Sequence, residues 1–323
     1  MLSFFKKFSY QKNNQHIDPL PSIVIKIPVN KWKRAYSWGD THMAILLKEQ
    51  LELLGHRVLI QVRSEWYNRE GRGYNTVIVF RGLKEYKTNP DQKNIMWNIS
   101  HPEKVSIKEY NSYDFVYIAS NYWKSIINQQ ATVPISAMLQ CTDPNRFKPF
   151  NDTSNDKFAN QLLFVGNSRG IYRKIIKDIL PTKYKLTIYG EKWEKLIPKQ
   201  YIKGQYIDNK CLYKYYSSTE ILLNDHWEDM RNNGFVSNRI FDGLACQTFI
   251  ITDNVEQIGD IGEYVQTYKT KKELELLIDY FLKNPKEREK KAIEGLKYVL
   301  EHHTFQKRAK QFSDKIKSLH ISS

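Results

Sequence analysis

Cysteine is scarce in this sequence of 323 residues, and its three cysteines, Cys141, Cys211 and Cys246, lie far apart. This spacing excludes a disulfide framework and a cysteine-based metal cluster. The histidines are equally dispersed, and no DxD-like pair of acids stands in a suitable turn. We therefore expect neither a bound metal nor a cofactor.

Long apolar runs are also missing. No segment approaches the length needed to span a bilayer, and none has the pattern of a signal peptide. Together with the few cysteines, this favours a cytoplasmic protein.

Acidic residues are the minority charge, with 35 Asp and Glu against 50 Lys and Arg, a formal net charge of +15. Such an excess attracts polyanions: nucleic acid, an anionic membrane surface or a phosphorylated substrate. The lysines are scattered and no zinc-finger or RNA-binding signature is present, so nucleic acid is not the favoured partner. With 41% hydrophobic and 13% aromatic residues, the chain has enough apolar surface to bury real cores.

In the first half of the chain, short apolar runs alternate with helical spacings. Helices are expected over Met43–Leu54 and Asn121–Gln129. The expected strands are the runs Ser22–Ile27, Arg57–Val62, Thr76–Phe80, Asn94–Asn98 and Asp114–Ala119. Strands interleaved with helices predict a parallel sheet covered on both faces.

The alternation stops at the polar, turn-rich segment Gln140–Asn160, the predicted linker, and then resumes. A helix is expected around Tyr172–Leu180, and the tail from Lys271 is expected to be mostly helical. The expected strands are Gln161–Gly166, Lys185–Gly190, Thr219–Asn224 and Thr248–Thr252. The predicted fold is α/β, with two doubly wound Rossmann-like domains facing each other across a cleft where ligands bind.

We expect a first domain over residues 22–150, a second over 151–303 and a closing helix over 304–323. The tail, residues 1–21, has Leu2, Phe5 and Phe8 on one helical face, with lysines beside them. Such a segment can lie on the anionic inner face of the cell membrane. A frayed tail, or one packed on the first domain, is the alternative.

A polar helix start is predicted where Ser237, as N-cap, precedes Asn238 and Arg239. Asp242 shares their helix face. The N-terminus and Arg239 suit a phosphate, and Asp242 can accept hydrogen bonds from two vicinal hydroxyls, as on a ribose. The alternative is a surface helix whose Arg239 and Asp242 pair with each other.

The segment FVGNSRGIYRK, residues 164–174, is a second phosphate-binding candidate. Gly166 and Asn167 lie in a strand-to-helix turn whose N–H groups can hold phosphate oxygens, and Arg169, Arg173 and Lys174 supply charge. A plain turn with solvated arginines is the alternative.

Several segments resemble glycosyltransferases of the two-domain GT-B fold, most of all the spore-maturation-type bacterial branch related to the retaining family 4. DHWEDMRNNGFVSNRIFDGLACQTFIITD, residues 225–253, resembles their C-terminal signature. QCTDPNRFKP resembles the interdomain segment, FVGNSRG the diphosphate-binding loop, and HHTFQKRAKQF the closing helix that crosses back to the first domain.

The resemblance implies a nucleotide-sugar donor, with Asp242 on the ribose, where the family has Glu. Arg169, with Arg173 or Lys174, matches the basic pair on the diphosphate. The loop that holds diphosphate and donor sugar corresponds to Gly234, Phe235, Val236, Ser237, Asn238 and Arg239. The first acid of the family's spaced acidic pair is missing, because Gly234 stands at that spacing.

Three further groups are expected to face the cleft. His101 follows a strand and resembles the family histidine near the reacting carbon; a turn-capping role before Pro102 is the alternative. Gly39 permits close approach of a ligand, and Asp40 or His42 is the candidate base for an inverting enzyme, unless both simply cap the first helix. A strand ends at Asn224, Asp225 and His226, which we expect to contact the donor or the acceptor. A plain loop is the alternative.

The expected function is sugar transfer from a nucleotide-activated donor to a glycan or lipid-linked glycan in capsule or lipopolysaccharide synthesis, with retention slightly favoured. Two alternatives remain. One is an inert protein of the same fold that holds a polyanionic glycan or nucleic acid in its basic cleft. The other is an enzyme that modifies DNA.

Overall fold

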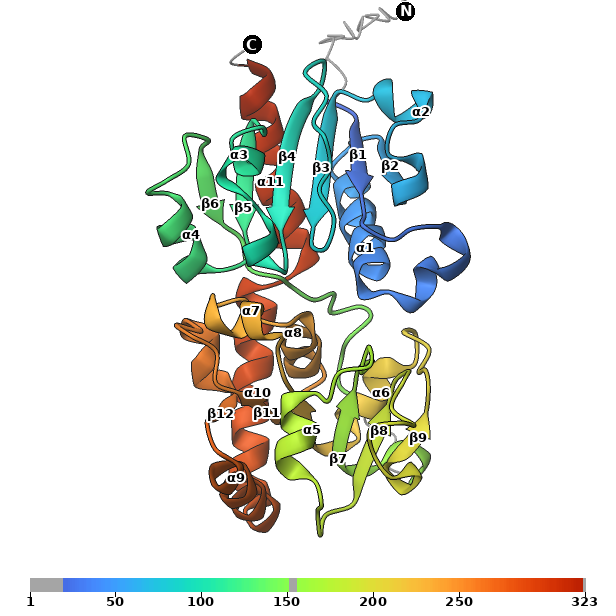
Figure 1. The fold of residues 1–323 in the computed structure, drawn as a ribbon, viewed down its shortest axis with the longest axis vertical. Coiled ribbons are helices and arrows are strands. Elements are labelled where there is room, and N and C mark those ends of the chain that lie inside the picture. The colour runs from blue at the N-terminus through green and yellow to red at the C-terminus, as the bar shows by residue number, and fades with distance from the viewer. Residues whose placement is uncertain (1–19, 151–155, 322–323) are drawn as a thin grey trace, which may run out of the picture.

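The computed structural model describes residues 20–150 and 156–321. The tail proposed to contact a membrane lies almost wholly outside these ranges. Two parallel six-stranded sheets stand one above the other, each with helices beside it (Figure 1). The predicted α/β class with two doubly wound domains is confirmed.

The first sheet has the strand order β2-β1-β3-β4-β5-β6. Its strands are β1 Ile23–Lys26, β2 Val58–Gln61, β3 Thr76–Arg81, β4 Lys93–Asn98, β5 Phe115–Ile118 and β6 Ile135–Ala137. Its helices are α1 Gly39–Leu53, α2 Arg69–Arg72, α3 Ile107–Tyr110 and α4 Asn121–Ile127. The strand order reverses between β1 and β3, which is where ligands bind in open α/β sheets.

The second sheet has the order β12-β11-β10-β7-β8-β9, with its reversal between β7 and β10. Its strands are β7 Asn160–Val165, β8 Leu186–Tyr189, β9 Ile202–Gly204, β10 Thr219–Asn224, β11 Ile250–Asp253 and β12 Gln266–Tyr268. The helices after the linker are α5 Lys174–Ile179, α6 Leu212–Ser217, α7 Glu228–Asn232, α8 Asn238–Ala245, α9 Lys271–Lys283, α10 Pro285–His302 and α11 Phe305–Ile321.

Two predicted boundaries change in ways that matter for the site. Helix α1 begins at Gly39 and not at Met43, because Trp38, in extended conformation, already serves as its N-cap. Gly39, Asp40 and His42 therefore stand in the first helical turns and not in a loop. Helix α5 begins only at Lys174, which leaves a longer loop after β7.

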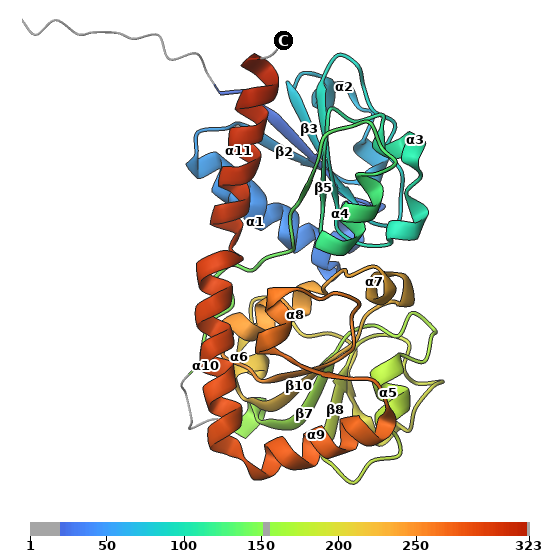
Figure 2. The ribbon, with the colours of Figure 1, turned by 90° about the vertical axis from the view of Figure 1, so that its left-hand side faces the viewer.

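Helix α11 belongs to the core of the first domain although it ends the chain. Figure 2 shows α10 beside the second domain and α11 beside the first, along one side of the molecule. Phe305, Phe312 and Ile316 are buried between α1 and the first sheet. The ring of Phe312 packs edge-on against Trp97, with 5.7 Å between centroids.

The chain crosses between the domains twice, and the two crossings pair. Thr142 donates its N–H to the carbonyl of His303 at 3.0 Å, and its own carbonyl accepts from Phe305 N–H at 2.9 Å. Buried Arg308 donates to the Leu139 carbonyl at 2.8 Å. These bonds fix the linker beside the base of α11.

Candidate active site

Three adjoining cavities follow the carboxyl edge of the second sheet, facing the first domain. The cavity beyond β7 and β8 has a volume of about 1000 Å³, and a smaller one of about 190 Å³ adjoins it. A third, of about 1110 Å³, extends over α5 and α7. Arg169 lines all three, so this residue marks the centre of the cleft.

The turn after β7 brings the backbone close to a second loop. Gly190 has a φ of +150°, and a Cβ there would lie 2.1 Å from the carbonyl oxygen of Gly166. A Cβ on Gly166 would lie 2.8 Å from the guanidinium of Arg239. Asn167 accepts the Glu191 N–H at 2.8 Å. Glycine at both positions therefore permits a compact turn whose open side faces the 1000 Å³ cavity.

Arg169 reaches into the cleft with its charge free for a ligand. Its guanidinium lies between the rings of Trp38 and Trp227, 5.3 and 5.4 Å from their centroids. No described residue forms a hydrogen bond or ion pair with it. Burial lowers the pKa of Arg169, while the nearby carboxylate of Asp40 opposes that shift.

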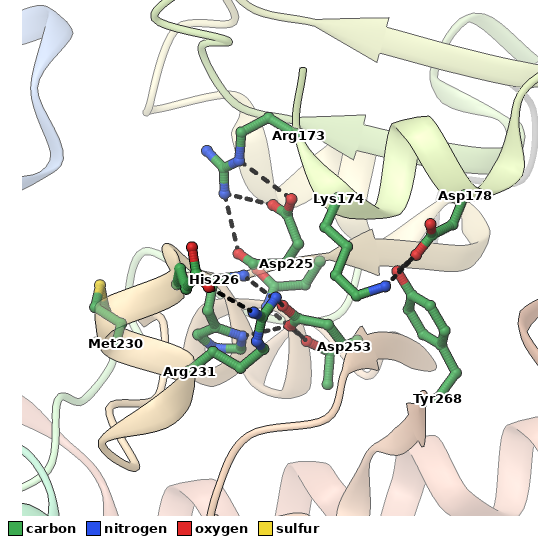
Figure 3. Close-up of polar contacts among 12 residues, drawn as sticks. Arg173, Lys174, Asp178, Asp225, His226, Met230, Arg231, Asp253 and Tyr268 are labelled. Atoms are coloured by element: carbon green, nitrogen blue, oxygen red, sulfur yellow. Dashed lines mark hydrogen bonds and ion pairs between the residues drawn. The ribbon is translucent and has the colours of Figure 1, made fainter. Parts of the chain in front are cut away.

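Arg173 and Lys174 have partners already (Figure 3). Arg173 donates to both carboxylate oxygens of Asp225, with 3.1 Å from its Nε, and the pair is almost fully buried. Lys174 pairs with Asp178 on the same helix. The members of the predicted basic pair therefore differ: Arg169 has no such partner among the described residues, whereas Arg173 is paired with Asp225 and still lines two of the cavities.

Helix α8 begins where the sequence predicts, but it is not the surface helix of the alternative interpretation. Every residue from Ile240 to Ala245 is buried. Arg239 donates to the side-chain oxygen of Asn224 and does not pair with Asp242. Ser237 occupies the N-cap position without a side-chain capping bond.

Asp242 is buried with both carboxylate oxygens occupied. Thr142 donates to one at 2.8 Å and the Asn238 amide to the other at 2.7 Å. Burial raises the pKa of Asp242 to about 7, and these two hydrogen bonds oppose the rise. Asp242 still lines the 1000 Å³ cavity, and the side-chain oxygen of Asn238 is buried without a partner among the described residues.

On the opposite wall, Asp40 and His42 differ in what holds them. His42 Nε2 donates to the Tyr36 carbonyl at 2.9 Å, and Nδ1 faces the Arg146 guanidinium at 3.4 Å. The lone pair of His42 Nδ1 therefore faces a cation. The Asp40 carboxylate receives no hydrogen bond from another described side chain, and burial raises its pKa. The N-cap residue Trp38 makes no side-chain capping bond, whereas the Asp40 carboxylate is hydrogen-bonded to its own backbone N–H in the first turn of α1.

His101 has a left-handed backbone, with a φ of 52°, and lines the 1110 Å³ cavity. Its Nδ1 lies 3.0 Å from the hydroxyl of Ser100. Although His101 precedes the short helix that starts at Pro102, its side chain makes no capping bond. Burial, together with the nearby cations Lys104, Arg169 and Arg81, lowers the pKa of His101 to about 4, so the ring is neutral near pH 7.

Four predicted contacts lie away from the cavities or beneath their surface. Gly234, with a φ of +73°, packs against Ser120 of the first domain, where a Cβ would lie 2.7 Å from the hydroxyl. Phe235 and Val236 are buried in hydrophobic clusters, so their side chains cannot reach a ligand. Asn224 is fully buried beneath Arg239.

Thr142, Gly190, Thr252 and Asp253 belong to the site but were not predicted from the sequence. Asp253 accepts from His226 Nδ1 at 2.7 Å, and the two come from the ends of neighbouring strands. Asp253 could have been singled out in the sequence, because it is the acid that ends the apolar run of β11. In residues 20–150 and 156–321, no three His, Cys, Asp or Glu side chains gather as a metal site would require.

Comparison with known proteins finds one family model that matches part of the chain. Residues 169–314 match the model of the glycosyl transferase-like family. Spore protein CgeB of Bacillus subtilis (strain 168) is 24% identical over 185 residues, which are 51% of this chain and 55% of CgeB. The match thus spans about half the length of that curated relative.

Solved structures share the fold at low sequence identity. Sucrose-phosphate synthase from Thermosynechococcus elongatus has a TM-score of 0.69 at 12% identity, covering 94% of this chain and 100% of its own. Anabaena HepE with UDP and glucose has a TM-score of 0.64 at 9% identity, covering 92% and 100%.

An α-glucosyltransferase solved with UDP and a 13-mer DNA has a TM-score of 0.60 at 10% identity, covering 92% and 99%. These likenesses agree with the two parallel sheets and the cleft between them. The predicted resemblance is thereby confirmed: the chain has the GT-B fold, and its residues 169–314 match the glycosyl transferase-like family.

Proposed function

We propose that this protein transfers a sugar from a nucleoside diphosphate sugar to a glycan acceptor. The observation that carries the proposal is the continuous lining of the 1000 Å³ and 190 Å³ cavities. Both are lined by Arg169 and Arg239, and Asp242 joins them in the first. A turn backbone, two cations and a carboxylate are what a diphosphate and a ribose require.

In this proposal Asp242 and the unpartnered oxygen of Asn238 accept hydrogen bonds from the ribose hydroxyls. The diphosphate lies against the turn at Gly166 and Asn167, with Arg169 on its open side. The sugar points into the smaller cavity, which is lined by Asp225, His226 and Ser237. Since HepE was solved with UDP, uridine is the donor nucleoside that we would test first.

During transfer, the acceptor oxygen forms a bond to the sugar carbon as the bond from that carbon to the diphosphate oxygen breaks. Negative charge then grows on the leaving diphosphate, where Arg169 stabilises it. With inversion, Asp40 takes the acceptor proton, because its carboxylate faces the cavity and its raised pKa suits a base. With retention, slightly favoured by the family resemblance, the leaving phosphate takes the proton.

For the acceptor we propose a glycan or lipid-linked glycan of a bacterial surface polysaccharide, such as capsule or lipopolysaccharide. The protein would then work at the inner face of the cell membrane. No helix in the described part of the chain is both long and apolar enough to cross a bilayer.

The test is a calorimetric titration with UDP, GDP, CMP and dTDP, repeated on Asp242→Ala and Arg239→Ala. We expect saturable binding of one nucleotide and its loss in both variants. Asp91→Ala and Arg69→Ala, exposed positions that line none of these cavities, are the matched controls. If no nucleotide binds at millimolar concentration, the proposal fails and an inert polyanion-binding protein becomes the better interpretation.

Transfer to DNA is the second candidate, and the net charge of +15 favours it. One structural neighbour was solved with a 13-mer DNA. Binding to duplex DNA that weakens steeply as salt rises would support this candidate, because phosphate contacts release counterions. Unchanged affinity between low and physiological salt would exclude it.

A further inference from the structure

A buried chain of hydrogen bonds runs beneath the cleft and joins two separate parts of the proposed donor site. Arg239 donates to Asn224, and the Asn224 amide donates to the Thr252 hydroxyl at 2.9 Å. Thr252 donates in turn to Asp253 at 3.2 Å. Asn224, Thr252 and Asp253 are fully buried, so water does not compete for these bonds.

The chain continues from Asp253 to the start of α8 through His226. One Asp253 oxygen accepts from His226 Nδ1 at 2.7 Å, and the other accepts from the His226 backbone N–H at 3.2 Å. On the far side of the ring, the Ser237 backbone N–H donates to His226 Nε2 at 2.9 Å. Figure 3 shows Asp253 and His226 together below the Arg173–Asp225 pair.

The direction of these bonds fixes the tautomer of His226. A backbone N–H can only donate, so Nε2 must carry the lone pair and Nδ1 must carry the proton. Asp253 is what holds the proton on Nδ1. If the proton moved to Nε2, the Ser237 N–H would face another N–H, and the hydrogen bond that holds the start of α8 would be lost.

We propose that Asp253 is a positioning residue for the donor diphosphate. Through Thr252 and Asn224 it orients the guanidinium of Arg239, and through His226 it orients the backbone at Ser237. Arg239 lies on α8 and Ser237 is its N-cap, so one carboxylate positions the cation and the start of the helix relative to one ligand. This inference rests on the proposed function, since it assumes that a nucleoside diphosphate binds there.

A matched pair of threonines tests the inference without removing a charge. Thr252→Val breaks both bonds of Thr252 at nearly constant volume. Thr248→Val is the control, because Thr248 is equally buried in the same segment and its hydroxyl has no partner among the described residues. We expect Thr252→Val to weaken UDP binding about tenfold, the effect of losing a buried hydrogen bond, and Thr248→Val to leave it within about twofold.

Asp253→Asn tests the bonds through His226, by calorimetry and by NMR of uniformly ¹⁵N-labelled protein. In the native protein we expect His226 as the Nδ1–H tautomer. In Asp253→Asn we expect a shift toward Nε2–H, a moved Ser237 amide signal and UDP binding about tenfold weaker. Because Asp253→Asn buries an extra N–H, its folding is checked by near-UV circular dichroism. If Asp253→Asn does not fold, the result for Thr252→Val decides the inference.

The outcomes separate the two proposals. If the native protein binds no nucleotide, the proposed function fails. If the native protein binds UDP, while Thr252→Val binds it as tightly as Thr248→Val does, the positioning role is overturned and the donor site stands. An Nε2–H tautomer in the native protein would also overturn it.

Discussion

Apart from Arg169, Arg239 and Asp242, the second-domain wall of the cleft holds its charges in buried pairs, whereas the first-domain wall presents Asp40 and His101 with few bonds to hold them. Arg173 pairs with Asp225 and His226 with Asp253. A wall of paired groups is preorganised and costs little to keep in place when the donor binds. The first-domain wall has hydrogen-bonding capacity left over, which suits the side where the acceptor and the reacting atoms meet.

Among substitutions on the two walls of the cleft, we expect the largest loss of stability at the Arg173–Asp225 pair. Arg173→Ala leaves the buried Asp225 carboxylate without its cation, and we expect the free energy of unfolding to fall by about 3–5 kcal/mol. Lys174→Ala is the control, because its pair with Asp178 is partly exposed, and we expect a loss of about 0.3–0.5 kcal/mol. Urea unfolding measures both. Equal losses would mean that burial does not distinguish these pairs.

On the first-domain wall the largest effect is expected in rate and not in stability. If the enzyme inverts, Asp40→Asn should lower kcat about 100-fold or more and leave the donor KM nearly unchanged. Because burial raises the pKa of Asp40, the native rate should rise with pH through that raised pKa, and this acid limb should vanish in the variant.

Hydrolysis of the donor sugar nucleotide, with water as acceptor, measures the rate. His42→Gln is the control, because its lone pair faces Arg146 and cannot take the proton. An unchanged kcat in Asp40→Asn would assign the proton to the leaving phosphate, and with it a retaining mechanism.

Asp242 sharpens the comparison, because it is a second-domain acid with hydrogen bonds but without an ion pair. Its folded pKa of about 7 lies above the ordinary value, so the folded state holds the proton more tightly than the unfolded chain. The ionisation of Asp242 therefore removes stability as the pH rises from about 4 to about 7.

Asp242→Asn removes this cost, and Asn238 can flip its amide to accept the new N–H. We expect the variant to be roughly 1–2 kcal/mol more stable than the native protein at about pH 8, with a smaller gap at about pH 5. Thermal unfolding at the two pH values measures the gap. A gap that is the same at both pH values would contradict the raised pKa.

The smallest effect is expected at Gly39, where a Cβ would meet nothing within 4 Å. Gly39→Ala should stabilise the first turn of α1 by about 0.5–1 kcal/mol, because glycine costs more entropy than alanine in a helix. Turnover should fall only if a ligand approaches this backbone. A destabilised variant in thermal unfolding would show that Gly39 supports the fold itself.

The main strands, of four to six residues, were predictable because most of them contain or adjoin a run of at least three consecutive apolar residues. The three-residue edge strands β6, β9 and β12 carry too short a pattern to be recognised. At the site, the helix start at Asn238 and the turn at Gly166 were predictable from local spacing. The Arg173–Asp225 pair was not, because its partners stand 52 positions apart in the sequence. The hydrogen bond from Thr142 to Asp242 was not predictable for the same reason, because the two residues stand 100 positions apart.

The place of α11 decides the order in which this protein can be completed as it is synthesised. Phe305, Phe312 and Ile316 fill the core of the first domain, yet they are translated after the whole second domain. While the second domain is being synthesised, the first domain therefore exposes the apolar strip of α1 and of the first sheet that α11 later covers. Deleting residues after His303 would thus damage the domain at the other end of the chain, and a chaperone that binds the nascent protein should find its site there.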